Sequence, residues 1–224
     1  MFRFRPEGKF LTPQQAGRVY DRIGRFQDWQ ILYEGSAIRE LVRLGSFETA
    51  KSVFEFGCGT GAFAEKIMKI VSPECRYVGL DVSPAMNRLA NRRLQRWADR
   101  ASVKLGDGSS RLPERDRQFD RFVSNYVFDL LSPEYAAAIL GEAHRVLNER
   151  GKLCLVSSGS GISRLSRVVT ALWERIWTYK PALVGGCRPV DLQSMLASDQ
   201  WSIEHHKTVI SFGITSEVVV ASRR

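Results

Sequence analysis

The sequence predicts an α/β protein with a doubly wound, mostly parallel sheet of seven strands. Three observations predict this fold: short apolar runs alternate with helical stretches, a glycine-rich turn follows the first run, and a short connection joins the last two runs. Alternating strands and helices are typical of a parallel sheet covered on both faces, whereas two strands joined by a short connection form an antiparallel hairpin. We therefore expect a Rossmann-like sheet that ends in an antiparallel hairpin.

Length and composition are those of one globular domain. The 224 residues, 44% hydrophobic and 25% charged, suffice for a sizeable core. We expect a single domain over 1–224, with an N-terminal arm and helical lid (1–46) and a core (47–224) that carries an insertion at 160–188. No apolar run is long enough for a transmembrane helix, and the N-terminus lacks the apolar segment of a signal peptide. Four widely spaced cysteines indicate a reducing, cytoplasmic compartment and no metal site.

The charge is the unusual global feature. A net charge of +9 and a pI near 9.7 can attract nucleic acid, anionic lipid or an acidic substrate. The arginines are spread along the chain, so a solvated surface without a partner explains the charge equally well. If lipid is the partner, we expect a peripheral contact with the inner face of an anionic membrane.

Two helices are expected before the first strand. Thr12 and Gln15 form a capping box around Pro13, and apolar residues then recur at helical spacing up to Phe26. The second helix covers about 29–44. The pair either covers the sheet or forms a lid over a ligand, with Tyr20 near that ligand.

The stretch from Ser52 to Ile67 combines a strand, a tight turn and a helix. Apolar residues enclose Glu55 in the strand, and glycine then occupies every second position of the turn, at Gly57, Gly59 and Gly61. Such a turn lets the backbone approach a ligand closely, and the following helix N-terminus presents unpaired N–H groups. The turn alone does not say which ligand binds.

The next two strands each end in a carboxylate. Tyr77–Asp81 ends at Asp81, twenty residues after Gly61, and Ser102–Leu105 is followed by Asp107. Because the carboxyl ends of parallel strands meet at one sheet edge, both side chains are expected there. Asp81 can accept hydrogen bonds from both hydroxyls of a ribose. Asp107 either accepts from an exocyclic amine, such as that of adenine, or caps its own turn.

Further elements complete the alternation. A helix opens at Ser83-Pro84, and its outer face carries arginines one turn apart, which form either a solvated face or an anion-binding surface. The segment Phe119–Tyr126 contains the fourth strand and the loop at its end. Ser132-Pro133 caps a helix whose inward residues extend to Leu147, and the fifth strand covers Lys152–Ser157.

The C-terminal part begins with an amphipathic helix over 162–177. This helix forms a wall of a ligand pocket, lies on a membrane surface, or simply packs on the core. A loop over 180–188 and a short helix from Pro189 to about Ala197 follow. The final strands are Ile203–Ile210 and Glu217–Ala221, with residues 211–215 between them.

Together these motifs resemble those of the class I S-adenosylmethionine-dependent methyltransferases, from about residue 10 to the end. The matching segments are Glu55-Phe56-Gly57-Cys58-Gly59-Thr60-Gly61, Gly79-Leu80-Asp81, Gly106-Asp107, Phe119-Asp120, and Arg145-Val146-Leu147 before Gly151-Lys152. The subgroup that the chain most resembles is the small-molecule and lipid methyltransferases of quinone biosynthesis and phosphatidylethanolamine N-methylation, which share Tyr20-Asp21. The resemblance implies S-adenosylmethionine as cofactor and S-adenosylhomocysteine as product.

The resemblance also implies roles for individual residues. The glycine turn lies close to the methionine part of the cofactor, Glu55 orders the turn, and Asp81 binds the ribose. The implied cofactor-binding residues are Tyr20, Glu55, Gly57, Cys58, Gly59, Thr60, Gly61, Asp81, Val82, Met86, Asp107, Gly108, Asn125 and Tyr126. A base is needed only if the acceptor arrives protonated. The catalytic candidates are Tyr126, Tyr20 and His144, although the helical position of His144 also suits a structural role.

The acceptor is expected to be a small molecule or a lipid rather than a nucleic acid. The segment after Ser124 lacks the Pro-Pro and Pro-Cys pairs of enzymes that methylate nucleic acid bases. Three alternatives stay open. Gly57-x-Gly59-x-x-Ala62 with Asp81 also fits a nicotinamide-dependent oxidoreductase. A non-catalytic cofactor-binding module has the same motifs, and the basic charge also suits an RNA methyltransferase.

Overall fold

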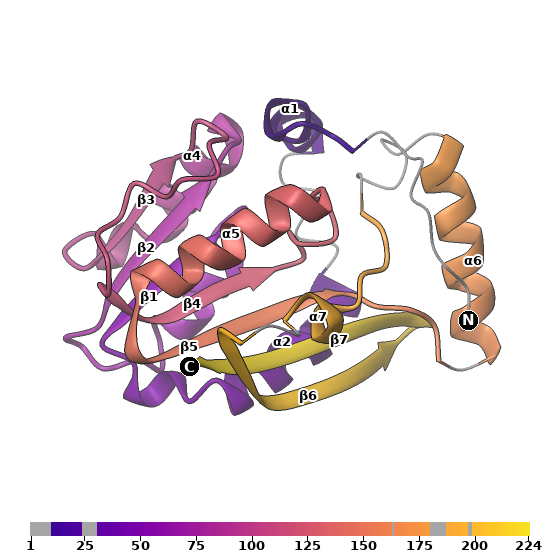
Figure 1. The fold of residues 1–224 in the computed structure, drawn as a ribbon. Coiled ribbons are helices and arrows are strands. Elements are labelled where there is room, and N and C mark those ends of the chain that lie inside the picture. Colours follow the sequence, from indigo (N-terminus) through magenta and orange to yellow (C-terminus); the bar gives the residue numbers. More distant parts are fainter. Residues whose placement is uncertain (1–9, 24–30, 163, 180–186, 197–198) are drawn as a thin grey trace.

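The computed structural model describes residues 10–23, 31–162, 164–179, 187–196 and 199–224. Seven strands form one sheet in the order β3-β2-β1-β4-β5-β7-β6 (Figure 1). The parallel strands are β1 (Ser52–Phe56), β2 (Arg76–Asp81), β3 (Ala101–Leu105), β4 (Phe119–Asn125) and β5 (Leu147–Ser158). β6 (Trp201–Ser211) and β7 (Ile214–Arg223) form an antiparallel hairpin, and β7 pairs antiparallel with β5. The expected fold class is confirmed.

Helices cover both faces of the sheet, because alternate residues of each buried strand point to opposite sides. On one face, α5 (Pro133–Val146) and α7 (Leu192–Met195) pack against apolar residues that include Phe54 and Phe122. On the other face, α2 (Ile31–Leu44) and α3 (Ala62–Ile67) pack against Val53 and Val123. α4 (Pro84–Arg93) lies along β2 and β3.

Two helices lie at the margins of this sandwich. α1 (Pro13–Ile23) lies near α4 and α5 at the top of Figure 1, and α6 (Arg164–Tyr179) stands apart at the right, beside β7. The capping box of α1 is confirmed: Thr12 N–H donates to Gln15 Oε1 at 2.9 Å, and Gln15 N–H donates to Thr12 Oγ1 at 3.2 Å. Residues 1–9 and 180–186 of the predicted arm and loop lie outside the described residues.

The structure corrects two predicted boundaries. Leu147 does not extend the helix but begins β5, because it pairs with Phe119 of β4. The predicted five-residue connection between the last strands was wrong. The turn consists of Phe212 and Gly213, with φ of 51° and 81°, the left-handed pair of a type I′ turn that matches the twist of a hairpin.

The helices of the C-terminal part also start later than predicted. The amphipathic helix starts at Arg164 and extends to Tyr179. The short helix begins at Leu192 rather than Pro189, because the Asp191 side chain accepts a hydrogen bond from Ser194 N–H at 2.9 Å and caps it there.

Candidate functional site

The glycine turn after β1 has a backbone that side chains disfavour. Gly57, Gly59 and Gly61 have φ of 73°, 52° and 76°, in the left-handed region. A Cβ on Gly57 would lie 2.3 Å from Cγ2 of Val127. The turn therefore needs glycine both for its conformation and for the close approach of Val127.

Asp81, at the end of β2, ties this turn to the start of α4. Its Oδ2 accepts a hydrogen bond from Gly59 N–H at 2.8 Å, and its Oδ1 accepts one from Ser83 N–H at 2.8 Å. Burial raises the pKa of Asp81, and these two N–H donors oppose the shift. Each carboxylate oxygen keeps acceptor capacity for a further donor.

Glu55 lies in the core of the sheet, only 2% exposed. The Tyr77 hydroxyl donates to Glu55 Oε2 at 2.5 Å, and Asn125 Nδ2 donates to Oε1 at 3.2 Å. Burial raises the pKa of Glu55 to about 8. Sequence analysis missed Tyr77, although a signal existed: Gly79, two residues further on the same face, leaves room for the tyrosine hydroxyl, which a Cβ there would approach to 2.9 Å.

α1 lies over the segments that follow β2 and β3. A Cβ on Gly17 would lie 3.2 Å from the carbonyl oxygen of Val82, and a Cβ on Gly108 would lie 2.8 Å from Pro13. The predicted adenosine contacts Val82 and Gly108 are thus beneath this helix. The side chain of Tyr20, also on α1, lies outside the described residues.

Asp21 fastens α1 to the start of α4. Its Oδ1 accepts hydrogen bonds from Ser83 Oγ at 2.6 Å and from Ala85 N–H at 3.1 Å. Ser83 is the N-cap of α4 and accepts from Met86 N–H at 3.1 Å. One carboxylate therefore joins the covering helix to the helix that follows the Asp81 loop.

Asp107 caps the turn that follows β3. Its Oδ1 accepts a hydrogen bond from Ser109 N–H at 2.7 Å, as expected if Asp107 caps its own turn. Its Oδ2 can still accept a hydrogen bond from another donor. The Tyr135 hydroxyl, on α5, donates to the carbonyl oxygens of Gly108 at 3.1 Å and Ser109 at 3.0 Å. Tyr135 thus orients this turn, and no sequence motif marked it.

Asn125 ends β4 next to Glu55, and Tyr126 follows the strand. Asn125 Oδ1 is buried and has no hydrogen-bond partner among the described residues. The Tyr126 hydroxyl instead pairs with Ser216 Oγ at 2.9 Å, and burial raises its pKa well above the usual value. Tyr126 therefore stays a phenol at neutral pH, which is unsuited to a general base.

The other predicted cofactor-binding side chains are buried beside the turn. Cys58, Thr60 and Met86 are 5%, 5% and 1% exposed. Arg93, on α4, donates to Thr60 Oγ1 at 2.7 Å. Among the residues that the structure describes, no three His, Cys, Asp or Glu side chains are grouped to hold a metal ion.

His144 does not belong to this site. Its ring contacts the Trp201 ring edge-on, with centroids 5.5 Å apart. Trp201 begins β6 opposite Arg223, at the end of β7, whereas the predicted site lies where β7 begins. The helical spacing could not reveal this, because α5 runs from one edge of the sheet to the other. The catalytic prediction for His144 is corrected.

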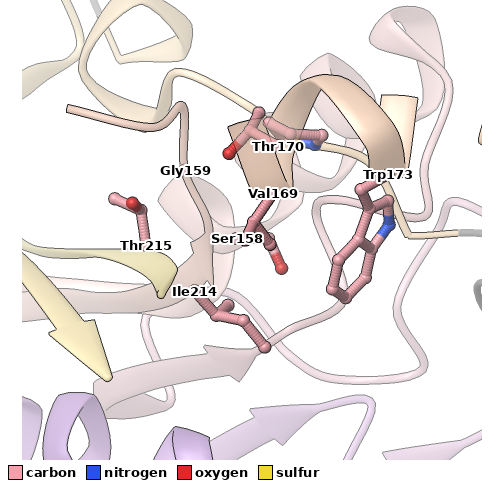
Figure 2. Close-up of a pocket in the computed structure, with 8 residues that line it drawn as sticks. Ser158, Gly159, Val169, Thr170, Trp173, Ile214 and Thr215 are labelled. Carbon is pink, nitrogen blue, oxygen red and sulfur yellow. The ribbon is translucent and has the colours of Figure 1, made fainter. Parts of the chain in front are cut away.

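A pocket lies where β5 ends and β7 begins (Figure 2). Val169 and Trp173 of α6 form one wall, and Ile214 forms another. Ser158, Gly159, Thr170, Pro189 and Thr215 complete the lining. Trp173 Nε1 donates to the Cys187 carbonyl oxygen at 2.9 Å, which holds this wall in place.

The methyltransferase domain family matches residues 53–151, somewhat less than half of the chain. This segment holds the glycine turn, Asp81, Asp107 and Asn125. The chain carries a methyltransferase domain. The resemblance to the class I S-adenosylmethionine-dependent methyltransferases is thereby confirmed.

Curated relatives of this chain are distant. A demethylmenaquinone methyltransferase from Symbiobacterium thermophilum is 24% identical over 171 residues, 73% of this chain and 67% of that protein. An uncharacterized 37.1 kDa protein from a Streptomyces fradiae transposon is 28% identical over 167 residues, 69% of this chain and 47% of that protein. This chain therefore spans about half the length of that relative.

Among solved structures, the [4+2]-cyclase SpnF has the same fold. The TM-score is 0.72 at 14% identity, over 95% of this chain and 97% of that one. Because this structural relative is a cyclase, the fold by itself does not specify methyl transfer. The chemistry of this chain therefore depends on the residues of its site.

Proposed function

We propose that this chain transfers a methyl group from S-adenosylmethionine to a small-molecule or lipid acceptor and releases S-adenosylhomocysteine. The observation that carries the proposal is the glycine turn held by Asp81. A carboxylate with spare acceptor capacity binds a turn whose three glycines have positive φ, and a Cβ on Gly57 would clash with Val127. The distant relationship to a demethylmenaquinone methyltransferase supports an acceptor of this class.

The polar groups of the site fit this cofactor. Asp81 can accept from ribose hydroxyls while it keeps its bonds to Gly59 and Ser83. Asn125 Oδ1, buried and unpartnered among the described residues, is an acceptor suited to the ammonium group of the methionine part. Asp107 Oδ2 suits the adenine amine. Bound there, the cofactor supplies an electrophilic methyl group on a sulfonium.

The chain's own contribution is then to position the reactants and exclude water. α1 covers the predicted adenosine side through Gly17 and Asp21. Positive charge disappears from the sulfonium during transfer, so a low-dielectric site favours the reaction with a neutral or anionic acceptor.

Calorimetric titration of the full chain with S-adenosylmethionine, S-adenosylhomocysteine and NAD tests the cofactor. We expect micromolar binding of the first two, and its loss in Asp81→Asn. The exposed Asp99→Asn is the matched control and should bind normally. Micromolar binding of NAD with none of S-adenosylmethionine would replace the proposal with the oxidoreductase alternative.

Turnover is tested by the release of S-adenosylhomocysteine with a panel of acceptors that includes quinol precursors, phosphatidylethanolamine and RNA. Release with a small molecule or lipid supports the proposal. Cofactor binding without release on any acceptor would indicate a non-catalytic module. Salt-dependent RNA binding together with methyl incorporation into RNA would indicate the RNA methyltransferase instead.

We also propose that this cytoplasmic protein contacts an anionic membrane surface through α6. Val168, Leu172 and Tyr179 on α6 are 67%, 60% and 76% exposed. The exposed Arg175 lies on the same helix face, and the exposed Arg167 lies to one side of it. Apolar side chains flanked by arginines, on a chain of net charge +9, suit the headgroup region of anionic lipid. None of the helices that the structure describes has the length and apolar content to cross a bilayer.

Sedimentation with vesicles tests this contact. We expect pelleting with phosphatidylglycerol vesicles at low salt and little with phosphatidylcholine vesicles. Replacing Val168 and Leu172 together by Asp should abolish pelleting. Ile70→Asp, which alters an exposed residue outside α6, should not. Equal, negligible pelleting with both lipids would refute the membrane contact.

A further inference from the structure

We propose that Asp129 and Arg188 form a polar subsite that holds the hydroxyl group of an apolar acceptor, as in a phenol or an enol, for transfer of the methyl group to its oxygen. This inference rests on the proposed methyltransferase function and names the acceptor class of the same site.

Both charged side chains are buried and incompletely bonded. Asp129 is 0% exposed; its Oδ2 accepts from Ser158 N–H at 3.3 Å, while Oδ1 has no partner among the described residues. Arg188 is 8% exposed; its Nη2 donates to the Leu131 carbonyl oxygen at 3.4 Å, while Nε has no partner there. Buried polar atoms without partners are costly, so two opposite charges left in this state indicate a ligand that satisfies both.

The backbone holds these two residues together at the carboxyl edge of the sheet. Arg188 N–H donates to the Asp129 carbonyl oxygen at 3.0 Å. Asp129 follows Asn125 by four residues, in the loop that leaves β4. The pair is therefore positioned next to the predicted methyl-donor site by main-chain contacts rather than by long, mobile side chains.

The pair also adjoins the pocket of Figure 2. Ser158, whose N–H binds Asp129, lines this pocket, and so does Pro189, which follows Arg188. A further pocket residue, Thr215, has a buried Oγ1 without a partner among the described residues. Since Trp173 and Ile214 present apolar surface there, the apolar body of an acceptor whose polar end reaches the pair would pack against them.

The two charges select the polar end of the acceptor. Asp129 would repel a carboxylate, and Arg188 would repel an ammonium. A neutral hydroxyl satisfies both residues, because it donates to Asp129 Oδ1 and its oxygen accepts from Arg188 Nε. Burial raises the pKa of Asp129 to about 6, so the group is a carboxylate at neutral pH yet a better proton acceptor than an exposed aspartate.

The transfer balances with these groups. A lone pair of the acceptor oxygen forms the new bond to the methyl carbon, and the pair of the broken carbon–sulfur bond stays on sulfur. The hydroxyl proton passes to Asp129. Arg188 stabilises the negative charge that develops on the oxygen before the methyl bond is complete.

Three naphthalene probes of similar size test the subsite on the full chain with S-adenosylhomocysteine present. They are 1-naphthol, 1-naphthoate and 1-naphthylmethylamine, which carry a hydroxyl, a carboxylate and an ammonium. Tryptophan fluorescence and calorimetry report their binding. We expect 1-naphthol to bind at least about tenfold more tightly than either charged probe. Equal affinities, or no binding of 1-naphthol, would overturn the subsite.

Variants then assign the selectivity to the two residues. Asp129→Asn should strengthen binding of 1-naphthoate relative to 1-naphthol, and Arg188→Gln should do the same for 1-naphthylmethylamine. The exposed Asp99→Asn and Arg92→Gln are matched controls. Unchanged selectivity in both folded variants would contradict the assignment. If a variant does not fold, the probe preference of the unaltered chain still decides the proposal.

The outcomes separate this inference from the proposed function. Titration with S-adenosylmethionine decides the cofactor independently of the naphthalene probes. Normal cofactor binding without preference for 1-naphthol overturns the subsite alone. Absence of cofactor binding overturns the methyltransferase proposal and, with it, the role of Asp129 in methyl transfer.

Discussion

Gly57 shows at the scale of one residue how backbone geometry dictates residue type. Gly57→Ala would strain a backbone with φ of 73° and place Cβ 2.3 Å from Val127 Cγ2. We expect the free energy of unfolding to fall by about 2 kcal/mol and cofactor binding to be lost. Urea denaturation and calorimetry measure the two effects.

Gly141 is the matched control for this substitution. It lies exposed within α5, and a Cβ there would meet nothing within 4 Å. Gly141→Ala should therefore raise the free energy of unfolding by about 0.5–1 kcal/mol, because alanine is the better helix former. Equal effects at the two glycines would refute the strain argument.

Glu55 makes stability depend on pH. Its pKa is about 8 in the folded chain, against an ordinary value of 4.5. Between these values the folded chain holds a proton that the unfolded chain has released, so the free energy of unfolding falls as pH rises through this range. Glu55→Gln should reduce this pH-dependent decrease in the free energy of unfolding by at least about 1 kcal/mol. Urea denaturation across the range measures it, and the exposed Glu48→Gln should keep the original slope.

Single residues also show where sequence reasoning stops. The alternation of strands and helices indicated that Asp81 and Asp107 stand where strands end, because these positions follow from local patterns. The hydrogen bond from Tyr77 to Glu55 depends on strand register, and the isolation of His144 depends on which end of α5 reaches the site. Neither is encoded by spacing within one element.

At the scale of elements, α1 is docked through one carboxylate. Asp21 accepts from Ser83 Oγ and Ala85 N–H, so Asp21→Ala removes both contacts and leaves a helix start less well capped. If α1 covers bound cofactor, we expect affinity for S-adenosylmethionine to fall about fivefold, equivalent to about 1 kcal/mol, with little loss of stability. Calorimetry compares this variant with the exposed Asp99→Ala. Unchanged affinity would contradict a covering role for α1.

Element types were predictable because apolar periodicity differs between strands and helices. The ends of the elements were less predictable, because strand pairing with residues far along the chain determines where each element ends. Leu147 continues an apolar helical pattern, yet its pairing with Phe119 places it in β5. Likewise, Phe212 and Gly213 form the whole hairpin turn because β6 and β7 stay paired up to Ser211 and Ile214.

At the scale of the whole molecule, Arg121 ties the segment that follows α2 to the sheet. It is 5% exposed, and its guanidinium donates to the carbonyl oxygens of Gly45 and Ser46, each at 2.7 Å. Arg121→Met removes the donor to the buried Gly45 carbonyl, whereas the Ser46 carbonyl keeps Thr49 Oγ1 at 2.9 Å. We therefore expect the free energy of unfolding to fall by about 1–3 kcal/mol.

Because this anchor joins residues beyond α2 to β4, we expect the predicted single domain to unfold in one transition. Far-ultraviolet circular dichroism and tryptophan fluorescence should then agree on a single urea midpoint for each protein, and this midpoint should be lower in Arg121→Met than in the unaltered chain. The exposed Arg76→Met is the control and should leave the midpoint unchanged. Two separate transitions in the unaltered chain would show that the helical segment and the core are independent units.

The sequence by itself determined the fold class, the glycine turn and the carboxylates at the strand ends, because each follows from periodicity or from conformational limits of neighbouring residues. Only the tertiary structure decided which of these groups meet. It joined Glu55 to Tyr77 and Asn125, set Asp21 against Ser83, and brought Asp129 beside Arg188. Those contacts connect segments far apart in the chain, and their partners are chosen by sheet order and burial rather than by local sequence.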